Sequence, residues 1–381
     1  MTDSRNLHFS FIRSNRLVPL QKIGKIMDEQ KQKDRVRGSL VGGAVGDALG
    51  YTVEFVSSYQ AIVNSYGPQG ITRLDTYNST GKGMISDDTQ MTLFTACGLL
   101  NAKSDGYAPV PSVCWAYLEW LYTQKGMRSK RFKDCWVGDL PEMNARRAPG
   151  ITCINALDSI LQGREPVNSS KGCGGVMRIA PVPLYGLSQD RIKDVWALDR
   201  LAAEVSELTH QHPLGYIPSY ILSHLIYRLA TDECPTRAAF LQYMHEAIGG
   251  AYNFFPAFEQ YLGYQNGLLN EAITLAKQDL PDHEAIAQLG EGWVAEETLA
   301  IAVYCAYKYL DDFKKAVVAA VNHGGDSDST GAVAGNLVGA AVGYSAIPQE
   351  YIQDLQLHDV ILHVADDLWR GHTTKYVQPN Q

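Results

Sequence analysis

The stretch that decides the fold is His323-Gly-Gly-Asp-Ser-Asp-Ser-Thr330, an octet with two carboxylates one residue apart and three hydroxyls beside them. A run of small apolar residues follows it, in which Gly331, Gly335, Gly339 and Gly343 are spaced by four. On a helix these glycines form one stripe, where a neighbouring backbone can approach closely. The octet therefore predicts the mouth of a buried and tightly packed helix.

The octet has more acidic groups than a helix start requires. Asp and Ser are preferred capping residues, so a plain N-cap explains one such aspartate. Two aspartates among hydroxyls, behind two glycines, instead indicate an all-oxygen site for a hard cation such as Mg²⁺ or Mn²⁺. Such a site needs more carboxylates from elsewhere in the chain.

A second acidic cluster, Ser86-Asp-Asp-Thr89, also precedes an apolar helical pattern. Adjacent carboxylates repel each other, so the Asp87–Asp88 pair favours a bound cation, although two solvated caps explain it nearly as well in isolation. Together the two clusters offer four aspartates and several hydroxyls, enough to surround a pair of divalent ions about 3.5–4 Å apart.

The segment Arg37–Gly50 resembles the small-residue run after the octet, and we expect a second core helix packed backbone to backbone. It is not a phosphate loop, because no Gly-Lys-Ser/Thr follows. Asp47 lies inside it and needs a partner if buried, so we expect a hydrogen-bonded structural role for it. Glu54, just after the helix, is a candidate catalytic carboxylate, with a structural role as the alternative.

A glycine-rich stretch, Ser169–Arg178, has free backbone N–H groups that suit a phosphate, although a plain turn is the commoner outcome. His210 closes a predicted helix that could face the same pocket, but a single histidine is more often structural.

Helical spacing dominates the chain and strand-like alternation is nearly absent, so we expect an all-α fold, one compact domain of many short helices. Residues 56–85 and Gly126–Gly150 are expected to be loops, the latter long enough to suggest a function. The segments expected to be helical are Val113–Leu121, Ile151–Leu161, Trp196–Leu208, Gly215–Ala230, Phe240–Ile248, Leu268–Gln278, Gly292–Cys305, Asp312–Val321 and a closing helix at Ile352–Trp369.

Composition excludes several classes of protein. With 381 residues and 45% hydrophobic content the chain has ample core, and its net charge of −8 argues against a nucleic-acid binder. No apolar run is long enough to predict a membrane span. Seven cysteines without a Cys-x-x-Cys pair indicate reduced thiols, which predicts a cytoplasmic location.

Residues 1–34 differ from the rest and are predicted to be an N-terminal extension to a domain at 35–381. Seven basic and four acidic residues give the extension a net charge of 7 − 4 = +3 on an acidic protein. A loose tail is the simpler interpretation. The alternative is an arm that docks on an acidic partner.

In this order the motifs resemble the ADP-ribosylglycohydrolase family, over roughly Arg35 to Trp369. The matching motifs are G-x-x-x-G-D-A-L-G with Glu54, Ser86–Met91, Gly172–Arg178, Thr209–Tyr216, Gly292–Glu297 and Asn322–Gly331. The resemblance implies a compact all-α fold with a binuclear Mg²⁺ or Mn²⁺ centre. Ser86 and Ser329 stand where relatives often have Thr, and Cys173 where they often have Asn.

The resemblance also implies roles for individual residues. The metal ligands would be Ser86, Asp87, Asp88, Asp326, Asp328 and Ser329. The catalytic residues would be Glu54, as acid or mobile gate, with Asp87 and Asp328. The substrate would be bound by Gly172, Cys173, Gly174, Gly175, Met177, His210, Gly215 and Tyr216.

The implied reaction is removal of ADP-ribose from a modified protein side chain, first of all arginine, with two Mg²⁺ or Mn²⁺ as cofactors and an ADP-ribosylated protein as partner. One rival is a metal phosphohydrolase of a nucleotide. Another is an immunity-type protein that masks an ADP-ribosyltransferase through residues 1–34. We expect neither nucleic acid nor membrane as a partner.

Overall fold

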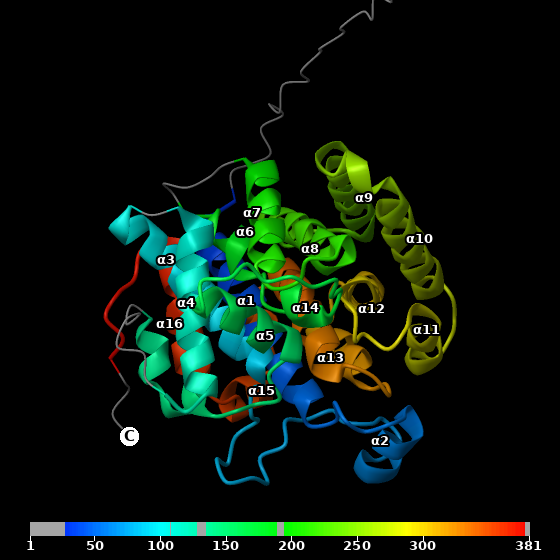
Figure 1. The fold of residues 1–381 in the computed structure, drawn as a ribbon. Coiled ribbons are helices and arrows are strands. Elements are labelled where there is room, and N and C mark those ends of the chain that lie inside the picture. Colours follow the sequence, from blue (N-terminus) through cyan, green and yellow to red (C-terminus); the bar gives the residue numbers. More distant parts are fainter. Residues whose placement is uncertain (1–26, 107, 128–134, 189–193, 378–381) are drawn as a thin grey trace, which may run out of the picture.

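The computed structural model describes residues 27–377 except 107, 128–134 and 189–193, and these residues form helices with only two isolated β-bridges. The helices surround α1 and α14 (Figure 1). The α-helices are α1 Glu29–Tyr51, α2 Tyr59–Tyr66, α3 Asp87–Asp105, α4 Pro109–Gln124, α5 Ile151–Leu161, α6 Pro181–Tyr185, α7 Val195–Glu207, α8 Pro213–Thr231, α9 Arg237–Phe254, α10 Glu259–Ala276, α11 Asp282–Leu289, α12 Ala295–Lys308, α13 Phe313–Val321, α14 Ser327–Val342, α15 Gln349–Asp354 and α16 His358–Arg370. Short 3₁₀ turns are η1 Trp136–Asp139, η2 Pro141–Asn144, η3 Cys173–Gly175, η4 Pro256–Phe258 and η5 Tyr344–Ala346.

Helices α1 and α14 pack antiparallel with their backbones in contact. A Cβ added to Gly46 would lie 1.9 Å from the carbonyl oxygen of Gly331, and one added to Gly42 would lie 2.6 Å from that of Gly335. The two glycine stripes therefore interlock along both helices, as the spacing predicts. At one end of the contact Gly50 meets Ser327, so the end of α1 lies against the start of α14.

The start of α3 is attached to the same place by Asp47 on α1. This buried carboxylate accepts hydrogen bonds from the backbone N–H groups of Ser86 and Thr89, at 3.0 and 3.1 Å, and from the Thr89 hydroxyl. Asp47 thus has the structural role expected of it. The ends of α1, α3 and α14 meet at one point, which brings the two acidic clusters together.

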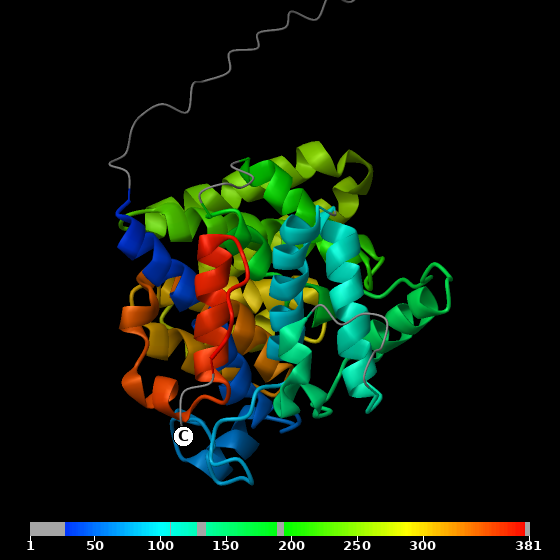
Figure 2. The same ribbon diagram turned by 90° about the vertical axis from the view of Figure 1, so that its left-hand side faces the viewer.

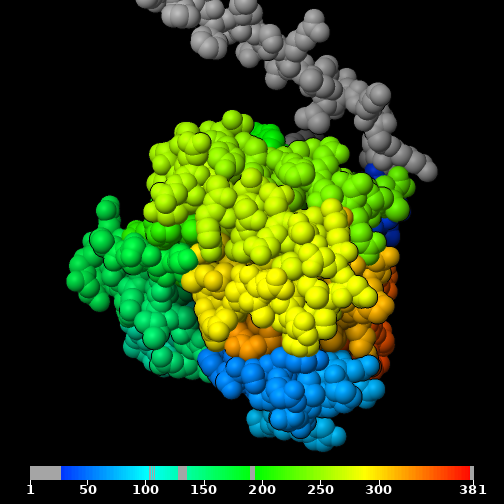
Figure 3. Space-filling view, turned by 90° about the vertical axis from the view of Figure 1, so that its right-hand side faces the viewer, coloured from blue at the N-terminus to red at the C-terminus, as the bar shows by residue number. Residues whose placement is uncertain are grey.

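The remaining helices form a cover around this centre. Helix α16 lies beside α1 and α3 (Figure 2), and α9 to α11 cover the opposite face (Figure 3). None of the described helices combines the length and the apolar character that crossing a membrane requires.

Two sequence expectations were wrong. Residues 56–85 are not wholly a loop, because α2 forms there, capped by the Ser58 side chain and closed by Gly67 at φ 93°. The expected closing helix is broken between α15 and α16, where Leu355 pairs with Gly83 and Leu357 adopts a φ of 57°. In the described part of Gly126–Gly150, the 3₁₀ turns η1 and η2 interrupt the expected loop.

Helix α1 begins at Glu29 and so includes the last residues of the predicted extension. One of these, Asp34, accepts hydrogen bonds from Ser345 N at 3.1 Å and Ser345 Oγ at 2.9 Å. Residues 1–26 of the extension lie outside the described residues.

Candidate active site

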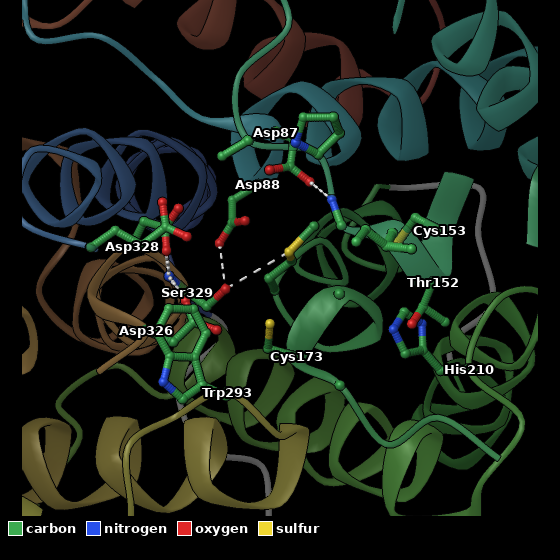
Figure 4. Close-up of a pocket in the computed structure, with 18 of the residues that line it drawn as sticks. Asp87, Asp88, Thr152, Cys153, Cys173, His210, Trp293, Asp326, Asp328 and Ser329 are labelled. Carbon is green, nitrogen blue, oxygen red and sulfur yellow. Dashed lines mark hydrogen bonds between the residues drawn. The ribbon is translucent and has the colours of Figure 1, made fainter. Parts of the chain in front are cut away.

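A cavity of about 740 Å³ opens where α1, α3 and α14 meet, within the size range of small-molecule sites. Carboxylates lie on one side of the cavity and His210 on the other (Figure 4). The lining residues are Glu54, Phe55, Asp87, Asp88, Arg146, Ala148, Pro149, Gly150, Ile151, Thr152, Cys153, Gly172, Cys173, Gly174, Met177, His210, Trp293, Asp326, Asp328 and Ser329.

The acidic side is formed by the first turns of α3 and α14. Ser86 caps α3 by accepting the N–H of Asp88 at 3.1 Å. Asp326 caps α14 and accepts the N–H of Ser329 at 3.4 Å, and the Ser329 hydroxyl bonds to Asp88 Oδ2 at 2.9 Å. The positive ends of two helices thus point at one cluster of acids, which lessens the cost of placing negative charge there.

The long segment before α5 holds Asp87 in place. The Asp87 N–H donates to the carbonyl of Arg147 at 3.1 Å, and its Oδ2 accepts the N–H of Gly150 at 3.3 Å. Between these contacts Ala148 has a φ of 54°, an uncommon backbone conformation for a non-glycine residue. The segment is therefore a shaped wall of the cavity, held on both sides of Ala148.

The carboxylates suit a hard cation. Glu54, Asp326 and Asp328 each offer an oxygen within 4.8 Å of the others, and all three are buried. Asp326 Oδ2 and Glu54 Oε2 are buried without a hydrogen-bond partner among the described residues. Of the lining residues only Arg146 carries a fixed positive charge. Buried acids without a counter-charge are costly, and divalent cations bound by oxygen would neutralise them.

The pKa values of these carboxyl groups also indicate a site that needs positive charge. Burial, followed by the charge of Asp328, raises the pKa values of Asp87, Asp88 and Asp326 well above the ordinary range for aspartate. The same two causes, in the same order, raise the pKa of Glu54 to about 9. A cation among these groups would reverse the effect by favouring their ionised form.

The opposite side of the cavity is the glycine-rich turn η3 with His210. The turn is held by an N–H of Cys173 that donates to the carbonyl of Trp293 at 3.2 Å. Added Cβ atoms on Gly172 and Gly174 would lie 3.4 and 3.3 Å from His210 Nε2. Glycine at both positions therefore lets the turn approach the imidazole closely where both line the cavity.

The predicted site residues lie in two groups. Most of them line the cavity, whereas Ser86, Gly175, Gly215 and Tyr216 are not among its described lining residues. Ser86 is fully buried behind Asp88, and Gly175 and Gly215 pack against each other beneath the turn. Tyr216 points into an aromatic cluster with Phe255, with ring centroids 5.7 Å apart.

Several lining residues were not selected from the sequence. They are Phe55, Arg146, Ala148, Pro149, Gly150, Ile151, Thr152, Cys153 and Trp293. Trp293 belongs to the Gly292–Glu297 motif, and residues 146–150 end the segment Gly126–Gly150, whose length suggests a function. Phe55, Ile151 and Cys153 gave no sequence signal, because single apolar residues beside helix ends are usually core.

The fold and site together define an all-α enzyme built around a carboxylate centre. A sequence profile of the ADP-ribosylglycohydrolase family matches residues 28–378, so the chain belongs to the ADP-ribosylglycohydrolase family. The predictions of the family, of the helical fold and of a hydrolase are confirmed.

Similar proteins cover most of the chain. The ADP-ribosyl-[dinitrogen reductase] glycohydrolase of Rhodospirillum rubrum is 26% identical over 85% of this chain and 91% of its own length. The ADP-ribosylarginine hydrolase Tri1 of Serratia proteamaculans is 23% identical, over 90% of this chain and 81% of its own. A solved ADP-ribosylglycohydrolase-related protein complex matches with a TM-score of 0.61 and 24% identity, over 90% of this chain and 99% of that one, and shows the fold.

Proposed function

We propose that this protein hydrolyses the N-glycosidic bond between ADP-ribose and a modified arginine side chain of a protein. The observation that carries the proposal is the cavity itself, with a cluster of buried carboxylates on one side and an open glycine turn on the other. The glycine turn suits a diphosphate, and the carboxylate side suits the ribose at the scissile bond. The names of the similar proteins support the same assignment, because they include an arginine-directed hydrolase and a dinitrogen reductase glycohydrolase.

The donor set fits two divalent cations, Mg²⁺ or Mn²⁺. Ser86, Asp87, Asp88, Asp326, Asp328 and Ser329 would hold them, and the cations would supply an acidified water and positive charge near the ribose hydroxyls. The unpartnered Oδ2 of Asp326 supports this role most directly.

The reaction forms a bond between a water oxygen and C1″ of the ribose and breaks the bond from C1″ to the guanidine nitrogen. A site aspartate, Asp87 or Asp328, takes one proton from the water. Glu54 lies at the end of α1, is 8% exposed and has a free Oε2, so it can pass a proton to the departing nitrogen. The products are ADP-ribose and an unmodified, protonated arginine.

The side chains at the rim of the cavity favour a protein as the substrate. Three lining residues there are exposed apolar side chains, Phe55 at 72%, Ile151 at 77% and Trp293 at 40%. Exposed apolar groups around a polar cavity are typical of surfaces that contact another macromolecule.

The test is incubation with arginine-ADP-ribosylated protein, with and without Mg²⁺ or Mn²⁺, followed by separation of the products. Release of free ADP-ribose and restored arginine supports the proposal, and release of phosphate would instead support a phosphohydrolase. Serine- and arginine-linked substrates compared side by side identify the acceptor.

The transferase-masking arm stays a prediction, because it rests on residues 1–34, of which 1–26 lie outside the described part. Binding of full-length and truncated chains to an ADP-ribosyltransferase tests it separately from hydrolysis.

A further inference from the structure

Arg178 is a fully buried arginine without an acidic partner among the described residues. Its guanidinium packs on the ring of Tyr117 at 4.3 Å, its Nη2 donates to Thr209 Oγ1 at 2.7 Å, and its Nε has no partner. A buried charge without a counter-charge is costly. This cost is reduced if an anionic ligand occupies the nearby cavity, and a path of contacts leads from Arg178 to the cavity wall.

The path continues through the Thr209 hydroxyl to His210. Thr209 Oγ1 lies 2.8 Å from His210 Nδ1. The other acceptors near this hydroxyl are the carbonyl of Ser206, at 3.5 Å, and the weakly accepting sulfur of Cys153. A hydroxyl has one hydrogen, and the shorter contact takes it. Thr209 therefore accepts from Arg178 and donates to Nδ1. The opposite arrangement would leave the threonine hydrogen directed either at an oxygen beyond ordinary bonding length or at the weakly accepting sulfur of Cys153.

This fixes the tautomer of the imidazole. A neutral histidine whose Nδ1 accepts must carry its hydrogen on Nε2. Nε2 faces the glycine turn where Gly172, Gly174 and His210 line the cavity, and within the described residues it has no hydrogen-bond partner. The molecule thus presents a free N–H donor to the cavity at the turn.

We propose that Arg178 and Thr209 are positioning residues that hold His210 as a neutral Nε2–H donor to an anionic oxygen of the substrate diphosphate. The identity of the ligand in this inference rests on the proposed function. The tautomer of His210 does not, because it follows from the hydrogen bonds of Thr209. Burial, and then the charge of Arg178, lower the pKa of His210 to about 3. The donor therefore keeps one protonation state throughout the physiological pH range, and the buried guanidinium adds attraction for the anion without contacting it.

The first experiment measures the tautomer without any substrate. Proteins labelled with ¹⁵N-histidine are compared by long-range ¹⁵N–¹H NMR, with the His210 signals assigned by the variant His210→Asn. We expect the Nε2–H form in the unmodified protein. A protonated Nδ1 would overturn the inference, even if the proposed function holds.

The second experiment compares Thr209→Val, which removes the hydroxyl at constant shape, with Thr209→Ser, which keeps it. Calorimetry with ADP-ribose should show at least tenfold weaker binding for Thr209→Val, and Thr209→Ser should stay within about threefold of the original. Adenosine, which lacks the diphosphate, should bind all three proteins equally. In Thr209→Val, kcat/KM should fall because KM rises, while kcat stays nearly unchanged.

The outcomes separate the two proposals. Equal ADP-ribose affinity in Thr209→Val and the unmodified protein would overturn the relay. Absence of hydrolysis with the expected tautomer and binding differences would contradict only the proposed function. If Thr209→Val fails to fold, the tautomer measurement and Thr209→Ser still decide, because a serine that weakens binding as much as tenfold would contradict the role of the hydroxyl.

Discussion

The hydroxyl of Ser329 donates a 2.9 Å hydrogen bond to Asp88, a residue 241 positions earlier in the chain. This bond joins the first turn of α14 to the first turn of α3 inside the buried cluster. Neither turn brings enough oxygen atoms for two cations, so the two-cation site that we propose requires both helices.

Asp326→Asn should abolish binding of Mn²⁺ and reduce turnover to background, because it removes the charge of a buried carboxylate whose Oδ2 has no hydrogen-bond partner among the described residues. Titration calorimetry with Mn²⁺ and helical circular dichroism are the measurements. The surface variant Asp312→Asn, at the cap of α13, should bind Mn²⁺ like the original. Full Mn²⁺ binding by Asp326→Asn would remove Asp326 from the ligand set.

Glu54→Gln should lower kcat and kcat/KM together by at least about 100-fold, as expected for loss of a proton-transfer group. The affinity for ADP-ribose should change by less than about threefold, since the amide keeps the shape of the side chain. Steady-state kinetics and calorimetry test this together. Weaker ADP-ribose binding at unchanged kcat would assign Glu54 to positioning alone.

Phe55→Ala should lower kcat/KM for an ADP-ribosylated protein by about tenfold, mainly through KM, if the exposed ring at the rim contacts the protein substrate as we propose. A small ADP-ribosyl-arginine substrate should be hydrolysed almost as before. Tyr77→Ala, which removes a fully exposed ring away from the cavity lining, is the matched control. Equal losses on both substrates would place Phe55 in ADP-ribose binding instead.

Gly46→Ala should destabilise the fold by about 1–3 kcal/mol or more, because its Cβ would overlap the carbonyl oxygen of Gly331. Gly249→Ala in α9 is the control, since nothing lies within 4 Å of its added Cβ and alanine favours a helix. The midpoint of urea unfolding should therefore fall for Gly46→Ala and rise for Gly249→Ala. A Gly46→Ala protein as stable as the original would contradict the backbone contact.

His323 should make the fold sensitive to acid. Burial lowers its pKa to about 4, below the ordinary value near 6.5, so below pH 6.5 only the unfolded chain gains the proton. Stability is then lost as the pH falls from about 6.5 to 4, by about 2 kcal/mol at pH 5. His323→Asn should lose that much less stability between pH 7.5 and 5 in urea titrations without divalent metal, because the neighbouring carboxylates act equally in both proteins. Equal pH dependence in the two would show that His323 titrates alike in both states.

The centre of the molecule could be predicted from the sequence because its signals are local and strong. Glycines spaced by four predict a close helix contact, and acids at helix starts predict a cluster once two such helices meet. Asp47 was predictable for the same reason, since an acid on a small-residue helix needs a partner. The Asn322–Gly331 motif was the segment most indicative of the family.

The walls of the site could not be predicted in this way. Ala148 lines the cavity because of a backbone conformation that alanine does not signal. Helix α2 depends on a serine cap and a single buried residue, Ile62, which is too short a pattern to separate from a loop. The last helix is interrupted where Leu355 pairs with Gly83 and Leu357 adopts a φ of 57°, and no local residue type announces this tertiary pairing.

The interlocked glycines of α1 and α14 also have a mechanical consequence. From Gly50, beside the acidic centre, the contact runs back to Gly38 against Gly339, about 18 Å away at 1.5 Å per residue. A side chain added at Gly38 would push α1 and α14 apart at that end and change the angle between them. The change in angle would shift the other ends of the two helices, which lie beside the acidic centre. Inherited or engineered changes at Gly38 would then slow catalysis from a distance, without touching any residue of the cavity.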